Sequence, residues 1–111
     1  MRQLTIDVRE GSPRQVVMAI AGEVDIATAP QLERALLRYT DCDVIVDLTA
    51  VTFLDSSGLT ALIQAYKRLQ QAGHALRTTG EREGVLAVMK VAGLMDIFHG
   101  SIAMGGSQPD K

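Results

Sequence analysis

Helical and strand-like hydrophobic patterns alternate along this 111-residue chain, and their order limits the folds available to it. The clearest helical pattern repeats at i, i+3, i+4, i+7 and i+10 opposite a polar face, through Leu59, Leu62, Ile63, Tyr66 and Leu69. Similar stripes predict one helix over residues 32–39 and another over residues 85–92. The glycines at positions 73 and 93 follow two of these helices, where C-terminal caps are expected.

Strand-like runs fill the intervals between the helices. Residues 4–8 alternate apolar and polar side chains, and residues 16–21 form a continuous apolar run that ends at Gly22. The turn between these runs contains Gly11 and Pro13, which predicts a hairpin. Residues 44–48 are interpreted as a strand buried on both faces, followed by a loop over residues 49–54. A short strand is expected at 75–79 and an edge strand at 97–104.

This order of elements predicts an α/β fold. Strands and helices that alternate through short connections favour parallel crossover units, and the first hairpin adds an antiparallel strand. We therefore expect one domain with a mixed sheet of four to five strands and three or more helices, mainly on one face. The domain is expected to span residues 1–104, and residues 105–111 are expected to form a flexible C-terminal tail.

Composition argues against several classes of function. The net charge is −2, and no basic cluster exceeds the pair Lys67 and Arg68, so a basic face for nucleic acid or anionic lipid is not expected. Cys42 is the only cysteine, which excludes an intramolecular disulfide. The chain has no apolar region typical of a signal peptide and no apolar run long enough to span a bilayer. We expect a cytoplasmic protein that neither binds nucleic acid nor inserts into membranes.

Residues 55–58, with the sequence Asp-Ser-Ser-Gly, precede the strongest helical stripe and admit two interpretations. Asp and Ser are favoured N-caps, and Gly58 would let the backbone turn tightly into the helix. The same helix start would tolerate a phosphate on Ser57, because the N-terminus favours an anion by roughly 0.3–1 kcal/mol. A partner docked there would instead have to bury about −1.5 to −2 charges. Spacing alone does not choose between cap and switch.

A catalytic role for Ser57 would require a general base within hydrogen-bond reach. His74 lies beyond the far end of a helix of about sixteen residues, roughly 24 Å long, and cannot reach it. His99 follows the last predicted helix, and its location is left open by the sequence. The glycine motifs of nucleotide-binding loops and of the nucleophile elbow are absent, so we expect no enzyme activity.

The acidic residues near the predicted strand ends raise the possibility of a metal site. Asp25, Asp47 and Asp55 could meet at one edge of the sheet, but such residues more often cap loops, and no metal or other cofactor is expected. In the preceding loop, Thr28 and Gln31 have the spacing of a capping box, and the proline at position 30 fits a first helical turn.

Three segments of the chain together resemble the STAS domain. They are GEVD at 22–25, VIVDLTAVTFLDSSGLTALI at 44–63 and VMKVAGLMDIF at 88–98. More narrowly, the chain resembles the bacterial anti-sigma factor antagonists over roughly residues 4 to 103. The D-S-S-G-L segment after a buried strand is the most specific part of this resemblance.

The resemblance implies a phosphorylation-switched binding protein. Such antagonists bind an anti-sigma factor that is also a serine kinase, which frees the sigma factor. The kinase then phosphorylates the serine that matches Ser57, and a PP2C-type phosphatase restores the active form. An alternative is a constitutive STAS scaffold or accessory subunit, in a stress-signalling complex or a lipid-transport ABC system, that uses the same helix start without modification.

Seven further residues are assigned to the expected site. The first group matches motif positions that shape the phosphorylation site: Asp25, Asp55, Ser56 and Gly58. The second group is expected to contact the partner, with Leu59 and Thr60 at the exposed helix start: Thr28, Leu59 and Thr60.

Overall fold

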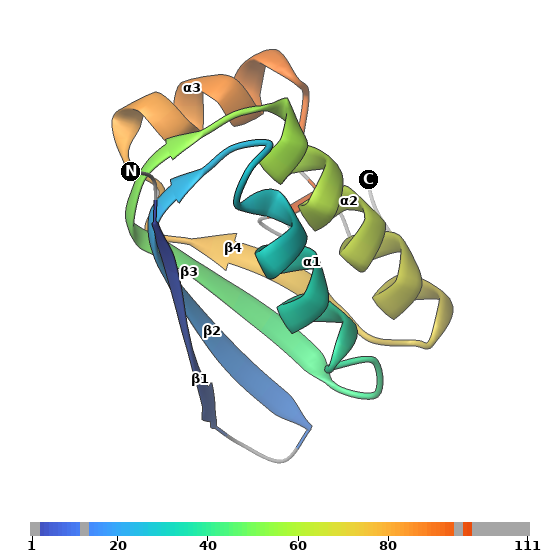
Figure 1. The fold of residues 1–111 in the computed structure, drawn as a ribbon. Helices are drawn as coiled ribbons and strands as arrows, with labels where there is room; N and C mark the ends of the chain where they lie inside the picture. Colours follow the sequence, from blue (N-terminus) through green and yellow to red (C-terminus); the bar gives the residue numbers. More distant parts are fainter. Residues whose placement is uncertain (1–2, 12–13, 95–96, 99–111) are drawn as a thin grey trace.

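The computed structural model describes residues 3–11, 14–94 and 97–98 (Figure 1). Within these residues four strands and three helices alternate as predicted. In chain order they are β1 (Leu4–Glu10), β2 (Gln15–Val24), α1 (Ala29–Leu37), β3 (Asp43–Leu54), α2 (Ser56–Gln71), β4 (Leu76–Thr79) and α3 (Glu83–Val91).

The strands form one mixed sheet in the order β1-β2-β3-β4. β1 is antiparallel to β2, whereas β2 and β3, and then β3 and β4, are parallel. Both the predicted hairpin and the predicted parallel crossovers are therefore confirmed. Figure 1 shows α1 and α2 side by side over one face of the sheet, while α3 lies beyond the end where β3 leads into α2.

The main core lies between the sheet and the helices. The side chains of Val44, Val46 and Leu48 in β3 are at most 1% exposed. Ile45 and Asp47, which point to the opposite face, are only half-buried. The prediction that this strand is buried on both faces is therefore wrong, because among the described residues α1 and α2 cover a single face (Figure 1).

The predicted loop at residues 49–54 is also wrong, since β3 continues as a strand to Leu54. β2 runs past Gly22 to Val24 and supplies the partner for this extension, so that Gly22 lies opposite Val51 and Val24 opposite Leu54. Two register shifts interrupt the pairing, between Ala19 and Ala21 and between Gly22 and Glu23. They disturb the period-two pattern, and that disturbance is why the segment resembles a loop in sequence.

The expected edge strand over 97–104 is wrong at its start. Phe98 donates its backbone N–H to the Leu94 carbonyl at 3.1 Å, which is a helical bond rather than a strand bond. This turn buries the Phe98 ring completely, edge-to-face against Tyr66 at a centroid distance of 6.1 Å. Residues 99–104 of that prediction, and the tail predicted at 105–111, lie outside the described residues.

Candidate functional site

Asp55 forms the N-cap of α2 and organises the start of the helix. Its Oδ1 atom accepts hydrogen bonds from the backbone N–H of Ser57 at 2.9 Å and of Gly58 at 3.4 Å. Its own N–H donates to the Val24 carbonyl at 3.1 Å, and its carbonyl accepts from the Leu59 N–H at 3.1 Å. The aspartate, rather than either serine, therefore caps the helix and joins it to the end of β2.

The two serines occupy different environments in the first turn. Ser56 is exposed, and its carbonyl accepts a hydrogen bond from Thr60 Oγ1 at 2.9 Å. Ser57 is half-buried and lines a groove together with Thr60. Ser57, the residue predicted to be phosphorylated, is therefore part of a concave surface.

Gly58 has a different role from the one expected of it. It lies inside α2 and is absent from the glycines with positive φ among the described residues, so it is not needed for a tight turn. A Cβ atom at this position would lie 2.7 Å from Val24 Cγ1 and 2.9 Å from Leu54 Cδ1. An alanine here would force these side chains to shift, because the first turn of α2 packs directly on the ends of β2 and β3.

The turn before α1 is built around the buried side chain of Asp25, which is 6% exposed. Asp25 Oδ1 accepts from the backbone N–H of Ala27 at 2.9 Å and of Thr28 at 3.1 Å. Thr28 Oγ1 donates to the Glu23 carbonyl at 2.7 Å and accepts from the Asp25 N–H at 3.0 Å. These reciprocal bonds fix the backbone on both sides of Ile26.

The predicted capping box is wrong. Thr28 makes no side-chain cap bond, and its own N–H is taken by Asp25. The Gln31 amide instead donates to the Leu4 carbonyl at 2.9 Å, since that neighbouring strand presents an acceptor within reach. The position of Pro30 in the first turn of α1 is confirmed.

Two residues predicted to contact the partner are buried. Leu59 is 7% exposed and belongs to the main core, because the helical phase that places Leu62 inward also places Leu59 inward. The expectation that Leu59 lies at an exposed helix start is therefore wrong. Thr28 is likewise 7% exposed and engaged in its turn. Ser57 and Thr60 remain as predicted residues that line a surface groove.

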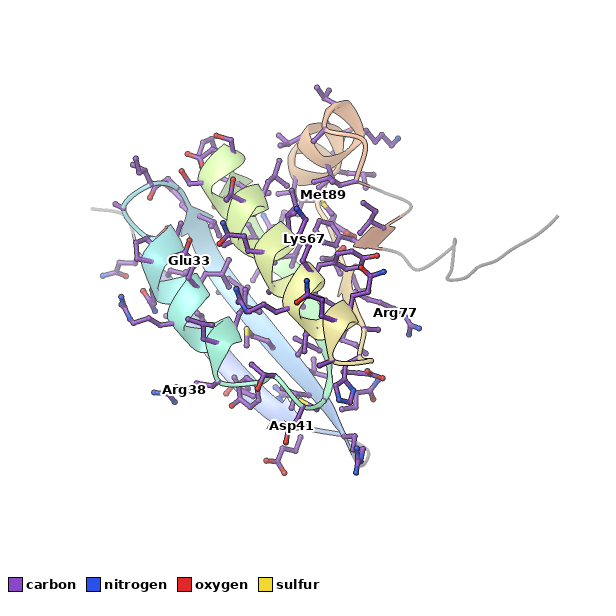
Figure 2. All side chains as sticks on the ribbon, turned by 90° about the vertical axis from the view of Figure 1, so that its right-hand side faces the viewer. Glu33, Arg38, Asp41, Lys67, Arg77 and Met89 are labelled. Carbon is purple, nitrogen blue, oxygen red and sulfur yellow. The ribbon has the colours of Figure 1, made fainter. Side chains whose placement is uncertain are left out.

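That groove lies between the N-terminal ends of α1 and α2 and has a volume of about 300 Å³. Its walls consist of Ile26, Ala29, Pro30, Glu33, Ser57 and Thr60. None of these lining residues is a lysine or arginine, and Glu33 adds a negative charge. Figure 2 shows Glu33 on α1, the helix that forms one wall of the groove.

Ile26 is the residue at this site that the sequence did not reveal. Its side chain is 80% exposed although hydrogen bonds of Asp25 and Thr28 hold the backbone on both sides of it. Ile26 lines the groove together with Ala29 and Pro30, so it adds apolar surface that a bound partner would cover. The exposure of Ile26 could have been predicted from its position in a turn, because it belongs to no strand or helix pattern that would bury it.

Serine catalysis at Ser57 and a metal site at Asp25, Asp47 and Asp55 are the two other chemistries that the sequence raised. His74 follows the C-terminal end of α2, with Nδ1 3.5 Å from Asp43 Oδ1, and is separated from Ser57 by the 16-residue helix. His99 lies outside the described residues. Asp47 does not join Asp25 and Asp55: its Oδ1 accepts from the N–H and Oγ1 of Thr49, at 3.0 and 2.6 Å.

Over residues 3–11, 14–94 and 97–98, no group of three or more His, Cys, Asp or Glu side chains is placed to hold a metal ion. In that part of the chain there is also no helix with the length and apolarity needed to cross a membrane.

Fold and site together define a STAS domain. The family model for the STAS domain matches residues 5–104. The anti-sigma-B factor antagonist of Listeria monocytogenes is 33% identical over 99 residues, covering 86% of this chain and 87% of that protein. The anti-sigma-B factor antagonist of Bacillus subtilis is 27% identical over 97 residues, covering 86% and 88%.

Among solved structures, an anti-sigma factor antagonist from Mycobacterium paratuberculosis is similar with a TM-score of 0.75 and 29% identity, covering 86% of this chain and 83% of that one. The chain belongs to the STAS domain family. Within that family its relatives include anti-sigma factor antagonists, as the sequence resemblance implied.

Proposed function

We propose that this protein is an anti-sigma factor antagonist that binds its anti-sigma factor at the groove between α1 and α2, and that phosphorylation of Ser57 ends this binding. The observation that carries the proposal is the position of Ser57. It lies in the first turn of α2, half-buried in a groove whose lining also includes the exposed Ile26. Modification at this point changes the charge of the surface that a partner would cover.

The fold is expected to accept the phosphate. Asp55 Oδ1 already accepts hydrogen bonds from the N–H groups of Ser57 and Gly58. A phosphate on Ser57 would therefore leave the cap in place and extend into the groove. The helix dipole favours the added charge by roughly 0.3–1 kcal/mol. Repulsion from the Asp55 carboxylate acts in the opposite direction and is weakened by water at this surface.

A bound partner is expected to reject the phosphate. Phosphorylation adds about −1.5 to −2 charges, and the groove offers no cationic side chain among its lining residues. Burying such a charge without compensation costs several kcal/mol. A loss of about 3 kcal/mol alone weakens binding more than about 100-fold.

In the proposed cycle the anti-sigma factor is itself the serine kinase, and a PP2C-type phosphatase removes the phosphate. The test begins with affinity purification of the protein from its own cells, which identifies the partner. The recovered complex is then incubated with ATP, and phosphate is mapped by mass spectrometry. Ser57→Ala tests the proposed acceptor, and Ser56→Ala serves as the matched control in the same turn.

Wild type and Ser56→Ala are expected to gain phosphate on Ser57 and to leave the partner, whereas Ser57→Ala stays bound. Release without phosphate on Ser57, or phosphate on Ser56 alone, would contradict the switch. Recovery of an ABC-type ATPase and its permease, without a kinase, would instead support the accessory-subunit alternative.

A further inference from the structure

β1 presents an outward row of backbone hydrogen-bonding groups at one edge of the sheet. Gly11 donates its N–H to the Gln15 carbonyl, and Glu23 donates its N–H to the Gln3 carbonyl, so the odd-numbered residues of β1 bond to β2. In an antiparallel pair the alternate residues then point their N–H and C=O groups away. The bond from the Gln31 amide to the Leu4 carbonyl agrees with this phase.

The free groups of Ile6 and Val8 therefore face outward, and in the part of the chain that the structure describes no strand pairs with them. Natural edge strands are commonly protected by charged side chains, above all lysine, by proline or by a bulge. β1 contains neither lysine nor proline, and its register with β2 is unbroken over all seven residues. Its charged residues, Asp7, Arg9 and Glu10, are of both signs, so the edge favours a strand whose charges complement them.

A groove of about 270 Å³ runs between this edge and α1. Ile6 and Val8 contribute its apolar wall and are only half-buried. Arg34 and Arg38 of α1 contribute positive charge on the other side. Figure 2 shows Arg38 extending from α1 on the side away from α2. A strand added to β1 would cover the apolar wall and bring its own side chains beside these arginines.

We propose that β1 pairs antiparallel with β1 of a second copy of this chain, around a two-fold axis at Val8. The outward backbone N–H and C=O groups belong to the even-numbered residues of β1. The two strands can therefore bond to each other only if even-numbered residues lie opposite even-numbered residues. Every register centred on a residue of the strand meets this condition, so the side chains and the bonds already made decide between them. Centring on Asp7 opposes two aspartates, and centring on Ile6 uses the Leu4 carbonyl already bound by Gln31. Only centring on Val8 places Asp7 opposite Arg9 of the second copy, twice.

Charge complementarity holds on both faces of this register. Asp7 and Arg9 share the face away from the helices, their side chains are 69% and 77% exposed, and they lie 3.4 Å apart within one chain. Pairing would produce an alternating square of four charges, and opposite charges across strands stabilise a sheet. On the helix face, Glu10 of the second copy would lie opposite Ile6, beside the groove that contains Arg34 and Arg38.

The expected dimer is weak and concentration-dependent. One seven-residue strand per copy provides less contact than the roughly 800 Å² per partner of a stable interface. The axis at Val8, which pairs with Met18, also lies away from the end of β2 that contacts Asp55. Dimerisation therefore leaves the Ser57 groove accessible, and it is independent of the proposed function.

Sedimentation velocity over micromolar to millimolar concentrations tests the proposal, starting from the 11.9 kDa monomer. Asp7→Arg and Arg9→Asp each set like charges opposite one another, and each is expected to weaken the dimer by roughly tenfold. An equimolar mixture of the two variants restores opposite charges and should dimerise. The double variant Asp7→Arg/Arg9→Asp should dimerise by itself.

Thermal melts of the variants serve as the folding control, since both side chains are largely exposed. A wild-type chain that stays monomeric over the whole concentration range overturns the proposal. This holds even if the edge of β1 pairs with a strand of another protein. Single variants that dimerise as well as wild type, or a mixture that fails to restore dimers, also overturn it.

Discussion

The Asp55 carboxylate accepts a hydrogen bond from the backbone N–H of Ser57 at 2.9 Å, so the capping residue and the proposed phosphate acceptor share one helical turn. The cap satisfies the helix start whether or not Ser57 is modified. A phosphate there is an addition to a completed cap and has no role in forming it. The fold and the switch can therefore depend on different atoms of the same motif.

Ser57→Asp is expected to weaken binding to the anti-sigma factor by roughly 100-fold, about 3 kcal/mol, because it places an unpaired charge in the covered groove. The melting temperature should change only slightly, since Asp55 keeps the cap. Isothermal titration calorimetry and a thermal melt measure the two effects. Ser56→Asp is the matched control, because Ser56 is exposed and is not among the residues that line the groove. A large fall in melting temperature for Ser57→Asp would indicate that Ser57 is chiefly structural.

Asp55→Ala is expected to lower the free energy of unfolding by about 1 kcal/mol, because the N–H groups of Ser57 and Gly58 lose their acceptor. Asp55→Asn retains a side-chain oxygen and should lose much less. Urea unfolding of both variants separates the hydrogen bond from the negative charge. Equal losses would show that the charge at the helix N-terminus, rather than the cap bond, supplies the stability.

Local periodicity was sufficient to predict most of the fold. The stripe from Leu59 to Leu69 predicts α2, because a helical repeat sustained over several turns has no competing interpretation. The second half of β3 could not be predicted in the same way. Its strand character depends on pairing with the extension of β2 across two register shifts, and this pairing is a relation between distant segments.

The candidate site was predictable as a motif but not as a surface. The sequence indicates that a helix starts within residues 55–58, since capping is a local property, but leaves open whether Asp55 or a serine is the cap. Leu59 was expected at an exposed helix start, whereas the structure buries it and exposes Ile26, for which no orientation was predicted. Both outcomes depend on how the helix and the turn sit on the sheet. The close contacts that a side chain at position 58 would make with Val24 and Leu54 cannot be predicted from a local pattern either.

Gly58→Ala is expected to destabilise the fold by about 1–3 kcal/mol, because the new Cβ atom would lie within 2.9 Å of Val24 and Leu54 side-chain atoms. Gly84→Ala is the matched control, since Gly84 is also in the first turn of a helix and nothing lies within 4 Å of its added Cβ. That control should stabilise the chain by up to about 1 kcal/mol through helix propensity. Chemical denaturation measures both changes. The two changes in the free energy of unfolding are expected to have opposite signs. A Gly58→Ala variant as stable as wild type would show that the Val24 and Leu54 side chains move aside at little cost.

Ile26→Ser is expected to weaken partner binding by roughly tenfold while leaving stability unchanged, because the side chain is 80% exposed in the free protein. Leu37→Ser is the matched control, being a 52% exposed aliphatic residue at the opposite end of α1. Titration of each variant with the purified anti-sigma factor measures the effect. Equal losses of affinity for the two variants would show that the partner does not bind specifically at the groove that Ser57 lines.

Asp47 provides a test of stability against pH. Its hydrogen bonds from the Thr49 hydroxyl and then the Thr49 N–H lower the pKa of the carboxyl below the ordinary value of 3.8. The folded state therefore binds the proton less tightly than the unfolded state. The stabilisation is complete above the ordinary pKa and is lost as the pH falls through the lowered one.

Asp47→Asn removes the titrating group, so it is expected to be less stable than wild type near neutral pH and to match it in strong acid. The difference should be small, because the carboxylate is near the surface and solvent screens it. Thr49→Ala should reproduce much of the effect, since it removes the hydroxyl that lowers the pKa most. Urea unfolding at a series of pH values measures the slopes. A difference from wild type that persists unchanged into strong acid would show that Asp47 acts through packing and that its ionisation has no part in the stability.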